Sequence, residues 1–231
     1  MPPELRDIFG GLAATYERVN HALTLGLDVS WRRRAARAAA RGGGSMWLDV
    51  CSGTGDMARQ LRRRALPGTR IAALDFSRPM LDLSAARPPA EGGFEFVLAD
   101  AARLPFPDAA FDLVTVAFAT RNLNLSRGAL TATFREFHRA LRPGGRFVNM
   151  ESSQPRFGPF RFLFRVYVRM FVRPVGRRLS GAGAGYAYLS ESITEFFPPE
   201  ELAEILREAG FSRVSFRRLT FGAAAIHIAI K

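Results

Sequence analysis

The stretch that decides the fold runs from Asp49 to Asp56 and reads DVCSGTGD. It overlaps an apolar run at Met46–Cys51 and leads into a helical pattern, so it predicts a buried strand, a loop and a helix in succession. Gly53 and Gly55 would let the backbone approach a ligand closely, and the first turn of the helix offers free N–H donors. We therefore expect a nucleotide-type cofactor at this loop, rather than a tight turn with a structural role alone.

Outward from this loop, short apolar runs alternate with helical patterns, which is typical of an α/β protein with a parallel sheet. Further strands are expected at Arg70–Asp75, Phe94–Ala99, Phe111–Phe118, Arg146–Glu151, Val214–Leu219 and Gly222–Ile230. The last two follow a helix that Pro198-Pro199 opens and Gly210 closes. Because they are consecutive, they predict an antiparallel hairpin at the edge of the sheet.

Three further segments complete the predicted organisation. A turn at Pro143-Gly144-Gly145 is expected just before the strand that starts at Arg146. The helix before that turn carries one apolar face, formed by Leu130, Phe134, Phe137 and Leu141. Residues 1–45 look helical and rich in arginine, and residues 155–190 interrupt the alternation as a lid or an insertion. We expect a single domain over residues 1–231.

The composition is that of a globular protein with an excess of positive charge. Hydrophobic residues make up 48% and charged residues 23% of the 231, which argues against a disordered chain. The net charge of +12 would suit nucleic acid, an anionic membrane surface or an acidic ligand as a partner. Lys231 is the only lysine, and the many arginines and alanines fit GC-rich codon usage equally well.

The sequence also indicates a compartment. The N-terminus carries two acids and has no apolar segment of the kind found in signal peptides. No run reaches the roughly 18 uncharged apolar residues of a membrane span. Cys51 is the single cysteine, which excludes an internal disulfide and a cysteine-based zinc site, and we expect no metal. A cytoplasmic protein is the expectation.

The glycine loop alone leaves the cofactor open. Gly53-x-Gly55-x-x-Ala58 also satisfies the relaxed dinucleotide fingerprint, and Asp75 lies 20 residues after Gly55, where an acid that binds the ribose of NAD would lie. Asp75 would hold the ribose hydroxyls of either cofactor.

Three features favour S-adenosylmethionine (SAM). Asp49 ends the first strand beside the loop, where its carboxylate can face a cationic amino-acid group. Asp100-Ala101 follows the third strand, where a second acid can meet an adenine amino group, although a turn cap would explain Asp100 as well. The hairpin at the end of the chain is the third feature.

The chain resembles the ubiquinone/menaquinone-biosynthesis C-methyltransferases (the UbiE/MenG family) over nearly its full length. The matching stretches are a Phe9…Tyr16…Asn20…Trp31 pattern, DVCSGTGD at 49–56, LDFSRPML at 74–81, LPFPDAAFDLVTVAFATRNL at 104–123, LRPGGRF at 141–147, YAYLSESI at 186–193 and LTFGAAAIH at 219–227. The glycine loop and the Pro-Gly-Gly segment are shared by many class I methyltransferases. The Arg121-Asn122 element and the YAYLSESI stretch are far more specific to the family.

The resemblance implies a Rossmann-like, seven-stranded class I methyltransferase sheet with an N-terminal helical segment and a helical insertion near 155–190. It also implies methyl transfer from SAM to a ring carbon of a prenylated quinol, such as demethylmenaquinol. The family's SAM contacts would fall here on Thr54, Asp75, Asp100 and Ala101. With the loop and its neighbours, the expected cofactor-binding residues are Asp49, Ser52, Gly53, Thr54, Gly55, Asp75, Phe76, Asp100 and Ala101.

The chain departs from the family pattern at a few positions. Phe118-Ala119-Thr120-Arg121-Asn122 stands where the family usually has Phe-Gly-(Leu/Ile)-Arg-Asn, and Ala117 replaces a common serine. Ala184-Gly185 replaces an Asp-Ser pair. These changes motivate a second interpretation, a methyltransferase of the same family that acts on another aromatic or polyketide acceptor. A third, an inactive SAM- or membrane-binding module, would require a broken glycine loop.

The candidate catalytic residues are Arg121, Asn122, Tyr186 and Tyr188. Arg121 and Asn122 follow the fourth predicted strand, and open α/β sheets place their sites at the carboxyl ends of strands. Arg121 would stabilise a phenolate or hold a water that removes the proton; the alternative is a structural ion pair with a nearby acid. The two tyrosines would line an aromatic acceptor pocket or pack within the lid. We interpret His227 as a core histidine and Cys51 as a small buried residue.

A basic, aromatic-rich segment suggests where the protein would bind a lipid-soluble quinol at the membrane. Arg161, Arg165, Arg169 and Arg173 recur every four residues among aromatic side chains, which predicts a helix at an anionic membrane surface. The alternative is a lid helix buried against the fold or against the second copy of a homodimer. No nucleic-acid-binding signature accompanies the arginine clusters, so nucleic acid is not expected as a partner. The expected location is the inner face of the membrane, with peripheral attachment.

Overall fold

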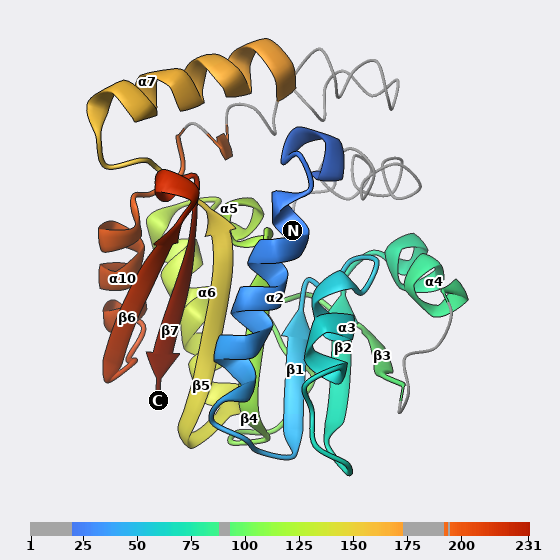
Figure 1. Ribbon diagram of the computed structural model, residues 1–231. Helices are drawn as coiled ribbons and strands as arrows, with labels where there is room; N and C mark the ends of the chain where they lie inside the picture. The colour runs from blue at the N-terminus through green and yellow to red at the C-terminus, as the bar shows by residue number, and fades with distance from the viewer. Residues whose placement is uncertain (1–19, 88–92, 173–191, 194) are drawn as a thin grey trace.

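The computed structural model describes residues 20–87, 93–172, 192–193 and 195–231. Within them, a seven-stranded sheet has the strand order β3-β2-β1-β4-β5-β7-β6 (Figure 1). The strands are β1 (Met46–Val50), β2 (Arg70–Asp75), β3 (Glu95–Leu98), β4 (Phe111–Ala117), β5 (Leu141–Ser152), β6 (Arg213–Leu219) and β7 (Ala224–Ile230). All seven predicted strands are present, and the predicted fold class is confirmed.

The sheet is parallel except at one strand. The pairs β1–β2, β2–β3, β1–β4 and β4–β5 are parallel, whereas β7 runs antiparallel to both β5 and β6. The expected terminal hairpin is therefore β6–β7, with β6 at the edge. This arrangement brings the carboxyl ends of β1, β2, β3 and β4 to one side of the sheet, where the predicted site residues lie.

Helices cover both faces of the sheet, and each face has its own apolar core. The helices are α2 (Leu27–Ala40), α3 (Asp56–Arg62), α4 (Arg78–Ala86), α5 (Thr120–Leu123), α6 (Arg127–Ala140), α7 (Gly158–Tyr167) and α10 (Pro199–Glu208). Figure 1 shows α2 and α3 on the near face of the sheet and α6 on the far face. Trp47 and Leu113 pack with α2 and α3, and their strand neighbours Leu48 and Val114 pack with α6 and α10. This alternation follows from the two-residue period of a strand and explains why the central strands β1, β2 and β4 are largely apolar at successive positions.

The region of Pro143-Gly144-Gly145 differs from the prediction. Here β5 begins at Leu141, which pairs with Phe111, and the register then shifts so that Leu113 pairs with Arg146. The Pro-Gly-Gly segment is thus an irregularity inside β5 rather than a turn before it. Gly144 has φ +74°, a conformation that glycine adopts readily, which allows the chain to bulge and rejoin the ladder. Leu141 is buried as predicted, but it belongs to this strand and not to α6.

Two helical segments lie beyond the carboxyl end of the sheet. Residues 20–23 are helical and lead to α2, and α7 continues into a π-helical turn, Val168–Val172 (Figure 1). Part of the expected N-terminal helical segment and part of the expected insertion are therefore observed. The rest of both, at residues 1–19 and 173–191, lies outside the described residues.

Candidate functional site

The predicted glycine loop joins β1 to α3 and has a left-handed backbone at three positions. Cys51, Gly53 and Gly55 have φ angles of +54°, +55° and +83°. The φ of Gly55 strains any other residue, and a Cβ there would also lie 2.3 Å from Ser84 Oγ on α4, so both the backbone and the space favour glycine. A Cβ at Gly53 would meet no protein atom within 4 Å, which leaves the space above the loop open to a ligand. Cys51 is not a glycine, and such strained positions cluster at functional sites.

Asp75 is the last residue of β2, and its carboxylate binds the backbone of the glycine loop. The backbone N–H of Gly53 donates to its Oδ2 at 2.8 Å, and the N–H of Ser77 donates to its Oδ1 at 2.9 Å. The side chain is buried, and this burial raises the pKa of Asp75 although the backbone hydrogen bonds act in the opposite direction. Each carboxylate oxygen retains acceptor capacity toward the pocket that Asp75 lines.

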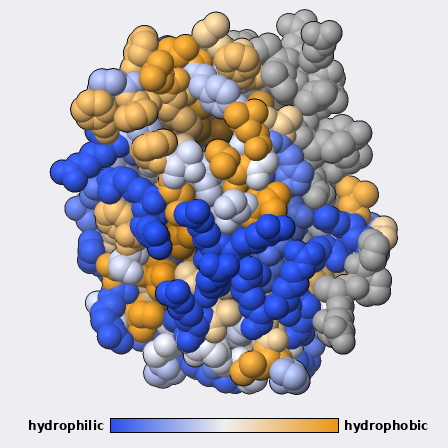
Figure 2. Space-filling model, in the orientation of Figure 1, coloured by the Kyte–Doolittle hydropathy of each residue, from blue (hydrophilic) through white to orange (hydrophobic). Residues whose placement is uncertain are grey.

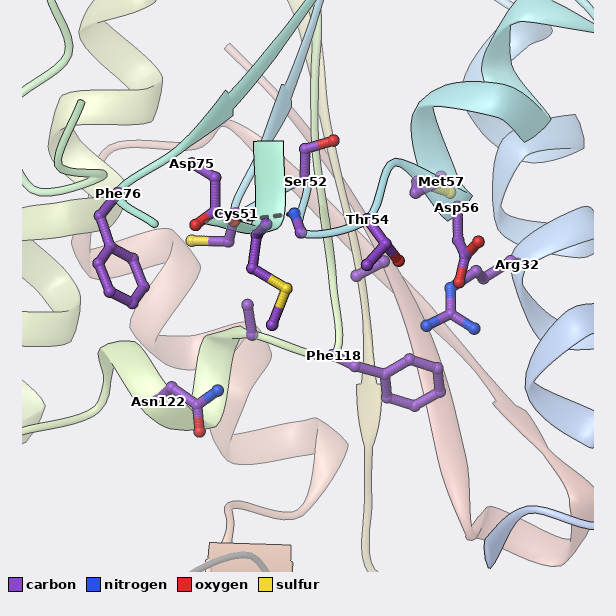
Figure 3. Close-up of a pocket in the computed structure, with 14 residues that line it drawn as sticks. Arg32, Cys51, Ser52, Thr54, Asp56, Met57, Asp75, Phe76, Phe118 and Asn122 are labelled. Carbon is purple, nitrogen blue, oxygen red and sulfur yellow. Dashed lines mark hydrogen bonds between the residues drawn. The ribbon is translucent and has the colours of Figure 1, made fainter. Parts of the chain in front are cut away.

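A pocket with about 660 Å³ of empty space lies over this loop. The predicted residues that line it are Ser52, Gly53, Thr54, Asp75 and Phe76, together with the catalytic candidate Asn122. Arg32, Met57, Met80 and Phe118 also line it, and none of them was predicted as a site residue. The arginines at 32–34 suggest a solvated helix face, which is wrong for Arg32 because that side chain is buried. Figure 3 shows Asp75 and Phe76 at one end of the pocket and Arg32 with Asp56 at the other.

Four predicted cofactor residues do not line this pocket: Asp49, Gly55, Asp100 and Ala101. Asp49 is buried under the loop, where it accepts a hydrogen bond from Thr115 Oγ1 at 2.7 Å, and burial raises its pKa to about 7. Asp100 follows β3 at the same end of the sheet as Asp75 and accepts a hydrogen bond from Ala102 N at 3.0 Å, as a turn cap does. Direct contact of these four residues with a cofactor remains a prediction.

Cys51 lies among these acids. Burial raises the pKa of its thiol well above the ordinary value, and the nearby carboxylates of Asp75, Asp49 and Asp100 raise it further. A thiolate is therefore disfavoured, which argues against a nucleophile. Cys51 is half-buried and lines the cofactor pocket, so the expectation of a buried residue is only partly met.

A second, larger cavity adjoins the first. It holds about 1040 Å³ of empty space and lies between the start of α2, the end of β5, and α7 with its π-helical turn. Most of its lining residues are apolar, among them Leu23, Leu25, Leu27, Trp31, Phe164, Tyr167, Val168, Ile193 and Ala223. Phe118 lines both spaces, so the narrow pocket and the apolar cavity meet at this ring.

Arg121 lies at the wall of the apolar cavity and is buried. Its Nη1 donates to Glu151 Oε1 at 2.7 Å and to Ser152 Oγ at 3.3 Å, and its backbone N–H donates to Glu151 Oε2 at 3.2 Å. The structure thus shows the structural ion pair, and Arg121 also lines the cavity; its action on a phenolate stays a prediction. Glu151 was missed as a site residue; its position as the only acid of a predicted strand, at the carboxyl end, was the available signal.

Of the remaining residues considered in the sequence, Tyr186 and Tyr188 lie outside the described residues, whereas His227 lies within them. His227 is buried in β7, and its Nε2–H donates to the carbonyl oxygen of Pro199 at 2.9 Å. Burial lowers the pKa of His227 to about 4, so the ring is neutral, as expected of a core histidine.

The model of the ubiE/COQ5 methyltransferase family matches residues 3–231. The chain belongs to this family. Demethylmenaquinone methyltransferase of Thermus thermophilus is 41% identical over 96% of this chain and 98% of its own length. The enzyme of the same name from Deinococcus radiodurans is 40% identical over 98% of this chain and 92% of its own. The expected family is confirmed, and the protein is a methyltransferase.

Solved structures support the fold of this methyltransferase. A methyltransferase in complex with the Haloferax volcanii activator Trm112 has a TM-score of 0.69 at 17% identity and covers 96% of both chains. Human N-acetylserotonin methyltransferase, solved in complex with SAM, has a TM-score of 0.66 at 18% identity and covers 100% of this chain and 60% of its own. In the described part of the chain, no helix is long and apolar enough to cross a membrane.

Proposed function

We propose that this methyltransferase transfers the methyl group of SAM to a ring carbon of a prenylated quinol, with demethylmenaquinol as the substrate. One observation carries the proposal: a narrow pocket with polar ends meets a large apolar cavity at Phe118, and Arg121 faces that cavity. The nucleoside of SAM requires a polar site, and a quinol ring with its prenyl tail requires an apolar site beside it. The names of the relatives from Thermus thermophilus and Deinococcus radiodurans support the same substrate.

The residues of the narrow pocket fit SAM. Asp75 offers acceptors to a pair of ribose hydroxyls, and the open space above Gly53 leaves room for the ligand to approach the loop backbone. Asn122 Oδ1 is buried without a hydrogen-bond partner among the described residues, which suits a ligand donor at this wall. When bound, SAM supplies a methyl group that its sulfonium makes strongly electrophilic.

The chain's own contribution is to orient the acceptor and stabilise its charge. The apolar cavity would hold the quinol ring so that the reacting carbon faces the boundary at Phe118. A quinol ring carbon becomes nucleophilic when a hydroxyl loses its proton, and the Arg121 guanidinium would stabilise the resulting phenolate. The ring carbon would then gain the methyl group while the bond between that methyl and sulfur breaks, and the same ring carbon would release its proton. Arg121 stays protonated throughout, so it is not itself the base.

Three departures from the family pattern lie away from the acceptor cavity, and the fourth, Ala184-Gly185, lies outside the described residues. Ala117 and Ala119 line the cofactor pocket, and Thr120 is buried with its hydroxyl bonded to Asn149 Oδ1. None of these three residues lines the apolar cavity. The alternative acceptor, another aromatic or a polyketide, therefore gains no support from the described cavity wall. The intact glycine loop likewise gives no support to an inactive module.

We propose further that the protein binds an anionic membrane surface through α7 and its continuation. The exposed apolar residues here are Phe157, Phe160, Phe162, Leu163, Met170 and Phe171, with Phe221 from the neighbouring turn. Figure 2 displays this apolar surface along the top of the molecule, over α7. Arg165 and Arg169 are exposed beside it, whereas Arg161 Nε donates to the carbonyl of Pro155.

The same elements connect this surface to the acceptor cavity. Phe164, Tyr167 and Val168 line the cavity from the other side of α7 and its π-helical turn. A lipid-soluble quinol would thus pass from the bilayer to the cavity across one helix, and the enzyme would act as a peripheral protein at the cytoplasmic face. Arg173, the last of the four arginines that recur every four residues, lies outside the described residues.

A methyl-transfer assay tests the proposed function. Purified protein is given methyl-labelled SAM and vesicles that contain chemically reduced demethylmenaquinone, and the lipids are examined by mass spectrometry. We expect a product one methyl group heavier, and none with the oxidised quinone, because only the quinol forms a phenolate. A panel of related benzoquinols and aromatic polyketides serves as the comparison; methylation of a panel member alone would contradict the substrate assignment.

A further inference from the structure

Arg32 is a buried cation that the function proposed above does not yet use. It lies on α2, and the residue is only 7% exposed. Its Nη1 pairs with Asp28 Oδ2 one turn earlier on the same helix. Its Cζ lies 5.0 Å from the centroid of the Phe118 ring, the residue that separates the two binding spaces. Figure 3 shows the guanidinium inside the cofactor pocket, between Asp56 and Phe118.

Asp28 holds this guanidinium firmly. Asp28 is fully buried and accepts hydrogen bonds from Thr24 Oγ1 at 2.9 Å and from His21 Nδ1 at 2.9 Å. Although burial raises the pKa of Asp28, the charge of Arg32 and these hydrogen bonds outweigh it, and the pKa lies below its ordinary value. Asp28 is therefore an anion, and Arg32 is held at one end through this pair. The other N–H groups of Arg32 have no hydrogen-bond partner among the described residues.

The charges around the pocket indicate which kind of ligand Arg32 would bind. Among the described residues that line the pocket, Arg32 is the only cation; the charged residues besides it are Asp56 and Asp75. Asp56 already pairs with Arg87 at 2.8 Å, and Asp75 accepts from two backbone N–H groups at the opposite end. A buried guanidinium with donors left over is suited to a carboxylate.

We propose that Arg32 binds the carboxylate of the methionine moiety of SAM, and that Asp28 positions Arg32 for this contact. The inference rests on the proposed cofactor. With the ribose at Asp75, the amino-acid end of SAM extends away from Phe76 toward the end of the pocket where Arg32 lies (Figure 3). Holding that end fixes the sulfonium beside Phe118, where the pocket meets the acceptor cavity. Asp28 lines the acceptor cavity, so a single ion pair spans both binding spaces.

Ligands with and without the carboxylate test this contact directly. S-adenosylhomocysteine carries the methionine-derived carboxylate, whereas 5′-methylthioadenosine has the same nucleoside and lacks it. Calorimetry would measure the affinity of both ligands for the wild type and for Arg32→Gln. We expect the variant to bind S-adenosylhomocysteine about tenfold or more weakly and 5′-methylthioadenosine equally well. An equal loss for both ligands, or no loss for either, would overturn the proposal.

Matched variants separate binding from folding. Arg33→Gln removes an exposed cation from the next position of α2 and should change neither affinity. If Arg32→Gln fails to fold because Asp28 is left unpaired, Arg32→Met/Asp28→Asn removes both buried charges and takes its place in the same comparison. Arg32→Lys should restore part of the S-adenosylhomocysteine affinity. If the wild type binds neither ligand, the proposed cofactor fails rather than the role of Arg32.

Discussion

Arg121 Nη1 lies 2.7 Å from Glu151 Oε1, and both side chains are buried at the carboxyl ends of neighbouring strands. Arg121 follows β4 in α5, and Glu151 is near the end of β5, so the parallel pairing of these strands brings the two together. The pair gives the guanidinium a fixed place at the cavity wall. A buried cation in a fixed orientation is what a developing phenolate requires, because no reorganisation is needed at the moment of reaction.

The first prediction concerns this ion pair. Arg121→Gln should lower kcat about 100-fold, since it removes one donor to the phenolate, while the affinity for S-adenosylhomocysteine stays the same. The single variant leaves Glu151 buried without its cation and should be less stable by about 3–5 kcal/mol. Arg121→Gln/Glu151→Gln should recover most of that stability and none of the activity. Recovery of kcat in the double variant would mean that Arg121 acts only as a structural partner.

The second prediction concerns Asp75. Asp75→Ala removes the acceptors for the ribose hydroxyls and for the N–H groups of Gly53 and Ser77, so SAM affinity should fall about 100-fold or more. Equilibrium binding of labelled SAM measures the change. Asp82→Ala, which removes an exposed carboxylate from α4, is the matched control and should bind normally. An unchanged affinity in Asp75→Ala would contradict the ribose assignment.

The third prediction concerns the pH dependence of stability. Burial holds the pKa of His227 at about 4, below the value of about 6.5 in an unfolded chain. Below about pH 6.5, the folded protein therefore binds fewer protons at His227 than the unfolded chain does. The stability that the neutral His227 contributes is complete above about pH 6.5 and is lost as the pH falls toward 4. The loss amounts to about 3 kcal/mol. Urea unfolding at pH 7 and pH 4 should show it in the wild type and not in His227→Gln; equal losses would refute it.

The strands β1, β2 and β4 were predictable because they are buried on both faces, whereas the edge strands β3 and β6 are partly exposed. Leu48 and Trp47 point to opposite cores, yet both are apolar, so β1 is visible in the sequence as a continuous run. The bulge in β5 was not predictable, because Pro143-Gly144-Gly145 is equally compatible with a turn and with a loop inside a strand. Only the pairing of Leu141 with Phe111, a tertiary contact, decides between them.

Part of the site could not be predicted from the sequence, again because tertiary contacts determine it. Arg32, Arg33 and Arg34 are consecutive and identical in type, and only the placement of α2 against the sheet buries the first and exposes the other two. The glycine loop was predictable because its backbone conformation depends on local sequence. Asp75 was predictable because it ends an apolar run 20 residues after Gly55, a spacing that is visible in the sequence. The apolar cavity depends on residues from α2, β5 and α7, and no local pattern brings these segments together.

The fourth prediction concerns the exposed apolar surface of α7. Phe162 and Leu163 are 68% and 60% exposed, and their transfer into a bilayer would contribute to membrane binding. Phe162→Glu/Leu163→Glu should weaken co-sedimentation with anionic phospholipid vesicles about tenfold or more, and leave the affinity for S-adenosylhomocysteine unchanged. Leu66→Glu is the control: Leu66 is 69% exposed and follows α3, so its charge should not alter vesicle binding.

The arginines beside this surface distinguish a membrane from a second copy of the chain. Arg165→Gln/Arg169→Gln should weaken binding to anionic vesicles, by about 1 kcal/mol for each charge, and leave binding to neutral vesicles unchanged, because these side chains would contact phosphate headgroups. The attraction should also fall as salt is added. If the surface instead joins two copies, the wild type should elute as a dimer and the charged α7 variant as a monomer, with no vesicle binding by either. That outcome would overturn the membrane assignment.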